Sequence, residues 1–298
     1  MFACVQLIPA AAPRLLERRR QQPPTLVRIH APRGAPFFRL EVPTRRGQQT
    51  ELPWAAMEQA AGRLRTRLLF PEGVIPPPPP PARSAAQAQL EPGLRAFQPK
   101  RLPLLLCLRA AQQTLLAAQT PARELRVTVV DTKGVLSHAI DLLVPLAGSL
   151  RVYTPDFSIY RSAAARVLHR YGATLILSDS VGCFAQSHVI IADDLRLFTG
   201  REAGLIFTPD TSTNLAGCHV VRCHAPQIPQ THANLCPPGI DLLQFACALF
   251  ELCGIKELER MPFDHYAFDG VSGQYSAEDL ARQLEEIQSR SCLSINKS

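Results

Sequence analysis

The sequence lacks any hydrophobic run long enough to cross a bilayer. The longest apolar runs, "PLLLCL" from Pro103 and "LLQFACALF" from Leu242, are well short of the ~20 residues that a transmembrane helix needs. The apolar N-terminal segment precedes the basic "RLLERRR", whereas a secretory signal has its positive charge first. We therefore expect a cytoplasmic globular protein with no membrane partner.

The sequence also lacks the even cysteine framework of a small secreted domain. Its nine cysteines are scattered through apolar surroundings, which favours reduced thiols. At 298 residues and 46% hydrophobic composition, the chain can bury one sizeable core and a smaller second unit.

Aspartate is absent from the first 103 residues, which carry 16 Lys and Arg against 6 Glu, together with 18 of the 27 prolines. Six of these prolines are consecutive, from Pro76 to Pro81, and a polyproline segment works as a semi-rigid spacer. We therefore expect a small basic strand-strand-helix unit over residues 1–75 and a proline-rich linker over 76–100.

The expected N-terminal unit has two alternating segments, "TLVRIHAP" and "PFFRLEVPT", followed by a helical pattern in "LPWAAMEQAAGRLRTRLLF". Arg63, Arg65 and Arg67 lie on the polar face of that helix and could contact phosphates. No helix-turn-helix, zinc-finger or RNA-recognition pattern accompanies them. We prefer a solvated basic face that suits an acidic partner.

From residue 101 strand-like and helix-like segments alternate. A helix begins "RLPLLLCLRAAQQ", and strands are expected at 126–131, 150–154, 174–179, 188–194, 204–209 and 218–224, with helices at 135–146 and 158–171. Short β-branched strands alternating with helices predict an α/β fold, a doubly wound, mostly parallel Rossmann-like sheet over residues 101–260. Residues 261–298 are expected to form a helical tail, in which Ser276 and Asp279 cap a helix with Leu280, Leu284 and Ile287 in one stripe.

The stretch "VTVVDTKGVLSHAIDLLVPLAGSLRVYTPDFSIYRSAAARVLHRYGATLILSD", with "HVIIADD" after it, resembles the NAD(P)-binding Rossmann domain of the shikimate dehydrogenase and glutamyl-tRNA reductase type. The resemblance covers about residues 126–209 and lies in the order of strand-like and helix-like segments, not in a shared motif. It implies a nicotinamide cofactor, NAD or NADP, or another small anionic or nucleotide ligand.

Dinucleotide sites need several glycines in the first turn, so that the backbone can approach the pyrophosphate. This turn has one, within Asp131, Thr132, Lys133, Gly134 and Ser137. A helix N-terminus at this place could still hold a phosphate, whereas the strand-end carboxylate opposes one. After the second strand, Thr154, Asp156, Ser158 and Arg161 are candidates for the ribose or its phosphate, and Asp156 or Ser158 is expected to cap the following helix.

The same turn also resembles the first motif of haloacid-dehalogenase-type phosphatases, in which an apolar strand ends in Asp-x-Asp-Gly. The resemblance implies Asp131 as nucleophile, Thr154 at the second motif and Asp193 and Asp194 on Mg²⁺. The second aspartate of the motif is Lys133 here, which removes the general acid.

A last constellation is Cys218, Cys223, His232 and Cys236, whose thiolate and imidazole groups suit tetrahedral zinc. Alternation of Cys218 and its neighbours also fits a strand facing a core, and we prefer that interpretation to zinc. The resulting hypothesis is a Rossmann-like binding or regulatory protein with a degenerate dinucleotide site. The alternatives are an NAD(P)-dependent oxidoreductase, a degenerate phosphatase and a metal-stapled scaffold.

Overall fold

The computed structural model describes two compact units within the chain, which are residues 1–99 with 228–258, and residues 100–227 with 259–298. We call them the N-terminal unit and the Rossmann-like unit. The residues described are 1–9, 23–44, 52–61, 67–74, 94–184, 186–200, 202, 204–210, 213, 215, 218–268 and 273–295. Most of the expected proline-rich linker, and Arg63 and Arg65, lie outside these residues.

The N-terminal unit is built on a five-stranded sheet in the order β2-β3-β1-β4-β5. Its strands are β1 (Phe2–Pro9), β2 (Thr25–Ile29), β3 (Phe37–Thr44), β4 (Arg67–Leu69) and β5 (Arg95–Ala96). The two strands expected from the sequence are β2 and β3, which pair antiparallel. The central strand β1, flanked by β3 and β4 in parallel, was not predicted.

Alternation along β1 gives the sheet two buried faces. Ala3 and Val5 join a cluster with Met57 of helix α1 (Trp54–Ala61). Phe2 points to the other face, where its ring stacks on Phe37 at 5.0 Å and meets Phe245 of helix α6 edge-on at 6.0 Å. Both faces of a sheet can be buried in this way because successive side chains of a strand point in opposite directions.

The chain returns to the N-terminal unit at Ile228. A short helix α5 (Gln230–Ala233) follows, and then helix α6 (Leu242–Cys253), which belongs to the same unit. The sequence analysis placed this segment inside 101–260, with the Rossmann-like sheet. A helix that is hydrophobic on most sides requires burial, and α6 buries Phe245, Cys247 and Leu249. Which sheet it covers depended on tertiary structure.

The helix expected over "LPWAAMEQAAGRLRTRLLF" is shorter than predicted. It ends at Ala61, and Leu68 lies in β4, where it pairs with Ala3. Leu68 is 1% exposed, so its hydrophobicity reflects a strand facing the same core as α1. The apolar spacing was compatible with either structure.

The Rossmann-like unit has a seven-stranded sheet in the order β12-β11-β10-β9-β6-β7-β8. Its strands are β6 (Arg126–Val130), β7 (Ser149–Tyr153), β8 (Ile176–Ser178), β9 (Val189–Ala192), β10 (Leu205–Phe207), β11 (His219–Pro226) and β12 (Phe263–Phe268). Six strands are parallel, and β12 adds antiparallel to β11. Counted from β6, the parallel order is 3-2-1-4-5-6, the order of the doubly wound Rossmann fold. The predicted α/β class is confirmed, whereas β12 replaces part of the expected helical tail.

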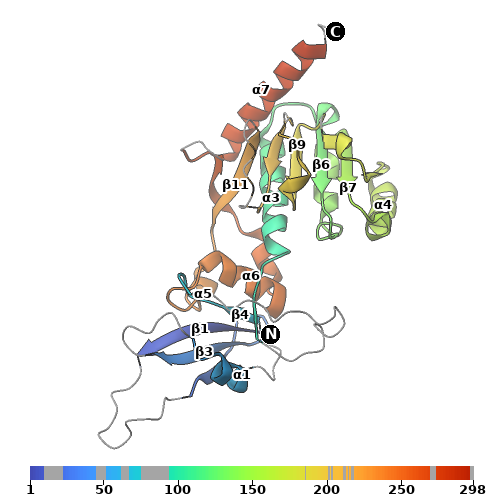
Figure 1. The fold of residues 1–298 in the computed structure, drawn as a ribbon. Helices are drawn as coiled ribbons and strands as arrows, with labels where there is room; N and C mark the ends of the chain where they lie inside the picture. Colours follow the sequence, from blue (N-terminus) through green and yellow to red (C-terminus); the bar gives the residue numbers. More distant parts are fainter. Residues whose placement is uncertain are drawn as a thin grey trace, which may run out of the picture. The chain divides into compact units, whose positions relative to one another are not determined.

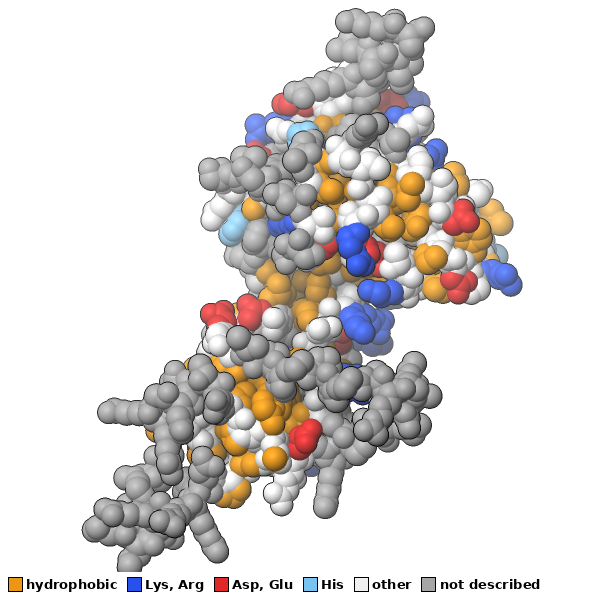
Figure 2. Space-filling view, in the orientation of Figure 1, with side chains coloured by type: hydrophobic (Ala, Val, Ile, Leu, Met, Phe, Trp, Pro, Cys, Tyr) orange, Lys and Arg blue, Asp and Glu red, His pale blue; other side chains and the backbone are white. Residues whose placement is uncertain are grey.

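Helix α3 (Leu102–Ala117) lies across one face of this sheet and contacts β9, β10 and β11 (Figure 1). Helix α4 (Phe157–Tyr171) follows β7 and contacts β8. The opposite face has its own cluster, in which Ile190 and Ile206 pack with Phe184 and Phe198 from short connections. Figure 2 shows hydrophobic side chains at the surface around α4.

The C-terminal helix α7 (Ala277–Ile295) contacts α3. Its capping box forms as predicted, because Asp279 accepts from the Ser276 amide at 2.8 Å and the Ser276 hydroxyl accepts from the Asp279 amide at 3.2 Å. Leu280, Leu284 and Ile287 are buried. Among the residues that the structure describes, no helix is long and apolar enough to cross a membrane.

The helix expected at 135–146 is absent. Two short 3₁₀ turns, η3 (Ile140–Leu142) and η4 (Val144–Leu146), occupy the segment. Leu136, Ile140 and Leu143 are buried, so the apolar spacing was interpreted correctly as a buried face and wrongly as an α-helix. Pro145 has no amide hydrogen to donate, which prevents a regular helix from continuing through it. The other 3₁₀ turns in the described part of the chain are Ala122–Glu124, Val181–Phe184, Leu195–Leu197 and Lys256–Arg260.

Candidate functional site

The candidate site lies at the carboxyl ends of β6, β7 and β9. The parallel register pairs Val130 of β6 with Ala192 of β9, so the next residue of each strand, Asp131 and Asp193, comes to the same edge of the sheet. In open α/β sheets, ligands bind at this edge where the strand order reverses. The reversal here falls between β6 and β9, because β7 follows on one side and β9 on the other.

The Asp131 carboxylate is bound by the turn that follows it. Its Oδ1 accepts from the backbone amides of Lys133 at 3.2 Å and Val135 at 3.0 Å. Its Oδ2 accepts from the amide of Leu136 at 2.7 Å. A turn that points several amides at one place is an anion-binding concavity. Here the anion is the protein's own side chain, which is fully buried.

A fourth donor to Asp131 comes from helix α4. The hydroxyl of Tyr160, itself 0% exposed, donates to Asp131 Oδ2 at 2.6 Å. Burial raises the pKa of Tyr160 far above its usual value, and the nearby Asp131 raises it further, so the phenol keeps its proton and acts as a donor. Tyr160 was not predicted as a site residue. Its only signal was an apolar-face position on a helix, which does not distinguish a hydrogen-bonding role from packing.

Asp193 binds the other side of the turn. Its Oδ2 accepts from both the Thr132 amide at 3.0 Å and the Thr132 hydroxyl at 2.6 Å. Burial raises the pKa of Asp193 against the lowering effect of these hydrogen bonds, and Asp131 raises it too. Its Oδ1 is buried and has no hydrogen-bond partner among the described residues. This edge of the sheet therefore contains a buried acceptor atom that no described residue satisfies.

Lys133 is the exposed cation of the turn. Its charge partly offsets the raised pKa of Asp193 and contributes to the lowered pKa of Asp194. Asp194 also binds Arg196, at 2.6 and 2.9 Å, and this hydrogen bonding is the largest cause of its lowered pKa. The charge of Lys133 is thus partly matched by neighbouring carboxylates.

Gly134 is required by packing. Its φ is +72°, in the left-handed region, and a Cβ built on it would lie 2.0 Å from Ile159 Cγ2 of α4. The glycine therefore allows the turn and α4 to approach each other. Ser137 donates its hydroxyl to the Gly134 carbonyl at 2.9 Å, and Arg166 of α4 donates to the Ser137 carbonyl at 2.8 Å.

The residues after β7 are mostly engaged in capping α4. Asp156 is the N-cap and accepts from the Ser158 amide at 2.9 Å, as predicted. Hydrogen bonding from the Ser158 side chain, and then from its amide, lowers the pKa of Asp156. Thr154 is buried and its hydroxyl lies 3.3 to 3.4 Å from backbone atoms of Asp156. Ser158 and Arg161 are exposed.

The four residues considered as zinc ligands are divided between the two units. Cys218 belongs to the Rossmann-like unit, where its thiol lies 3.8 Å from Glu202 Oε2. His232 and Cys236 belong to the N-terminal unit. His232 is 2.7 Å from Glu257 Oε1, and the Cys236 thiol faces two backbone carbonyls, of Pro237 and Ile240. The Cys223 side chain lies outside the described atoms. In the described part of the chain, no group of three His, Cys, Asp or Glu is placed to hold a metal.

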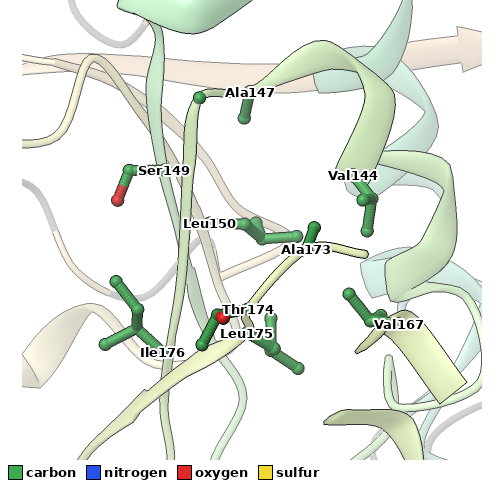
Figure 3. Close-up of a pocket in the computed structure, with 10 residues that line it drawn as sticks. Val144, Ala147, Ser149, Leu150, Val167, Ala173, Thr174, Leu175 and Ile176 are labelled. Carbon is green, nitrogen blue, oxygen red and sulfur yellow. The ribbon is translucent and has the colours of Figure 1, made fainter. Parts of the chain in front are cut away.

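A small pocket of about 270 Å³ lies elsewhere in the Rossmann-like unit (Figure 3). Its lining includes Ser149 and Leu150 at the start of β7 and Ile176 at the start of β8. These are the amino ends of the strands, whereas Asp131 and Thr154 follow carboxyl ends. The lining is mainly aliphatic, with Val144, Val167 and Leu175.

Comparison with known proteins leaves the family open. No protein-family model matches the chain, and no curated protein matches it in sequence. Several solved structures are similar in part, and two of them are described here. L-tryptophan dehydrogenase from Nostoc punctiforme is 14% identical, with a TM-score of 0.30 over 86% of this chain and 68% of that one. Quinate dehydrogenase from Corynebacterium glutamicum in complex with NAD is 13% identical, with a TM-score of 0.30 over 84% of this chain and 89% of that one. The Rossmann-like assignment rests on the strand order described above.

Proposed function

We propose that this protein is a Rossmann-like binding or regulatory protein whose dinucleotide site has become degenerate. The observation that carries the proposal is the Asp131 carboxylate, which takes three backbone amides of the turn after β6. In a working dinucleotide fold, glycines in this turn let the pyrophosphate approach the backbone. A pyrophosphate at this place would compete with a buried carboxylate and be repelled by its charge.

The ligand class that suits the edge differs from a dinucleotide. The buried Oδ1 of Asp193 has no partner among the described residues, so it favours a ligand that donates a hydrogen bond, such as a hydroxyl or amino group. Exposed Lys133, Ser158 and Arg161 lie on the segments that follow β6 and β7. We infer that a nucleoside-like or other polyhydroxyl ligand fits better than NAD(H) or NADP(H).

The geometry of the turn favours this proposal over both catalytic alternatives. For an oxidoreductase, the strand order is favourable but the phosphate turn is occupied. For a phosphatase, Asp131 would be the nucleophile, yet it is fully buried and receives four hydrogen bonds. A nucleophile in that environment has no free lone pair directed toward substrate.

The test is calorimetric titration of the full chain with NAD⁺, NADH, NADP⁺ and NADPH. We expect dissociation constants weaker than about 100 μM for all four, equivalent to less than about 5.5 kcal/mol of binding free energy. The Lys133→Glu variant is the informative comparison, because Lys133 is exposed and its replacement leaves the turn's packing intact. Gly134→Val is unsuitable, since any side chain at Gly134 collides with Ile159.

Low-micromolar binding of any dinucleotide, lost in Lys133→Glu at unchanged melting temperature, would overturn the proposal and favour the oxidoreductase. A second variant, Asp131→Asn, removes the competing charge while keeping one carbonyl acceptor. We expect it to bind inorganic pyrophosphate more tightly than the native chain. Equal binding by both would show that Asp131 does not close the turn to anions.

A further inference from the structure

The pocket at the amino ends of β7 and β8 lies in a gap between these two strands. Their parallel pairing begins at Arg151 and Ile176. The residues just before them, Leu150 on one side and Thr174 and Leu175 on the other, line the pocket of about 270 Å³ (Figure 3). The pocket therefore occupies the place where hydrogen bonds between the two strands would continue if their pairing extended further.

The backbone amide of Leu150 is directed toward this gap. Successive residues of a strand direct their amides alternately to the two neighbouring strands. The Ser149 amide donates on the β6 side, to the Leu125 carbonyl at 3.2 Å. The Thr154 amide donates on the β8 side, to the Ser178 carbonyl at 3.0 Å, and the Leu150 amide shares this direction. No described backbone carbonyl accepts from it across the gap, although Leu150 is only 5% exposed. A buried amide without an acceptor is unfavourable, and a ligand that accepts from it removes that cost.

The lining of the pocket combines aliphatic side chains with two hydroxyl groups. Val144, Val167 and Leu175 are among the aliphatic residues, and the hydroxyls belong to Ser149 and Thr174. None of the lining residues is charged. An ionised ligand would lose hydration in this pocket without gaining a partner of opposite charge, and a water molecule there would meet few polar groups. The lining therefore favours an uncharged ligand with an apolar body.

We propose that this pocket binds a small aliphatic carboxamide, whose carbonyl oxygen accepts a hydrogen bond from the Leu150 amide. The carbonyl takes the place of the absent strand partner, the NH₂ group donates to a lining hydroxyl, and the aliphatic chain packs against Val144 and Val167. A cavity of about 150 Å³ admits benzene, so this pocket has room for a ligand of roughly ten non-hydrogen atoms. The site lies at the opposite end of the strands from Asp131, and it does not depend on the function proposed for that edge.

Nuclear magnetic resonance titration of the full chain with 4-methylpentanamide tests the proposal. We expect a saturable downfield shift of the Leu150 amide proton, because the proton gains an acceptor when the ligand binds. For a ligand this small we expect a dissociation constant of about 0.1 to 10 mM. The 4-methylpentanoate anion has the same size and shape but carries a charge at neutral pH. It should bind at least tenfold more weakly than the amide.

Filling the pocket tests its location. Ala173→Leu enlarges a lining residue and should raise the dissociation constant of the amide at least tenfold. The matched control is Ala164→Leu on α4, because Ala164 is half-buried like Ala173 and is not a lining residue. It should change the constant less than twofold. The melting temperature of each variant shows whether it is folded, and if Ala173→Leu is not, the comparison of amide and anion on the native chain decides.

Three results would overturn the proposal. The first is a Leu150 amide proton in the native chain that does not shift at amide concentrations up to about 50 mM. The second is equal binding of the amide and the anion. The third is a folded Ala173→Leu variant that binds the amide as tightly as the native chain does.

Discussion

The Tyr160 hydroxyl donates a 2.6 Å hydrogen bond to the Asp131 carboxylate, and both side chains are fully buried. The bond joins helix α4 to the turn after β6, the place where a dinucleotide-binding protein holds its ligand. The bond therefore both stabilises the unit and keeps the carboxylate directed into the turn.

Removing this hydroxyl should destabilise the protein measurably. Tyr160→Phe keeps the ring but leaves Asp131 Oδ2 with one fewer donor, which we expect to cost about 1 to 2 kcal/mol of unfolding free energy. Urea denaturation monitored by circular dichroism measures the change. Tyr171→Phe on the same helix is the control, because Tyr171 is 39% exposed, and it should alter stability by less than about 0.5 kcal/mol. Equal effects in the two variants would contradict the buried bond.

Gly134 should tolerate no side chain, for two separate reasons. Its φ of +72° disfavours any residue with a Cβ, and that Cβ would lie 2.0 Å from Ile159 Cγ2. We expect Gly134→Ala to cost about 2 to 4 kcal/mol. Gly172 has a similar φ of +64° with no atom within 4 Å of its Cβ position, so Gly172→Ala should cost only about 1 kcal/mol.

The difference between the two glycine variants isolates the packing contribution. Shortening the neighbour in the double variant Gly134→Ala with Ile159→Ala should recover part of the loss, so that the two substitutions are not additive. Thermal or urea unfolding of all four proteins gives the coupling. Strict additivity would show that Ile159 does not determine the requirement for glycine.

His188 should make stability depend on pH near neutrality. Its ring nitrogens face the Arg126 amide at 3.2 Å and the Arg126 guanidinium at 3.1 Å. Burial first, and then the charge of Arg126, lower the pKa of His188 from 6.5 to about 4. The unfolded chain therefore takes up a proton below pH 6.5 that the folded chain refuses until about pH 4, and stability falls as pH decreases through that range.

Between pH 7.5 and 5.5 this protonation should lower the unfolding free energy by about 1 kcal/mol. Unfolding in urea at a series of pH values measures the slope. His188→Gln keeps a polar group beside Arg126 without a titrating ring, so its slope in this range should be smaller. An unchanged slope would assign the effect to other groups.

Cleavage in the proline-rich segment should leave the N-terminal unit assembled. Trypsin is expected to cut at Arg83, within the segment 76–100 that the sequence marks as a linker. The two fragments should still elute together in size exclusion, because Phe245 of α6 packs against Phe2 and Phe37 at 6.0 and 5.4 Å. Phe245→Ala should weaken this association. Separation of the native fragments would show that α6 does not hold the sheet.

The sequence by itself determined the elements whose local signals agree. Alternating and β-branched runs located eight of the strands, since their period of two is a local property. Capping residues located the starts of α4 and α7, because an N-cap bonds to amides only two or three residues away. The single glycine of the first turn already indicated that a pyrophosphate would be poorly held.

Only the tertiary structure decided what fills that turn and what α6 covers. The apolar spacing of 135–146 fits a 3₁₀ segment as well as an α-helix, and the local pattern does not choose between them. Tyr160 is 29 positions from Asp131 in the chain, and Asp193 is 61 positions from Thr132. No local sequence pattern identifies partners that are this far apart. Helix α6 is apolar on most sides, so its sequence indicates burial but does not specify which sheet it covers. The answer depends on the return of the chain to the N-terminal unit at Ile228.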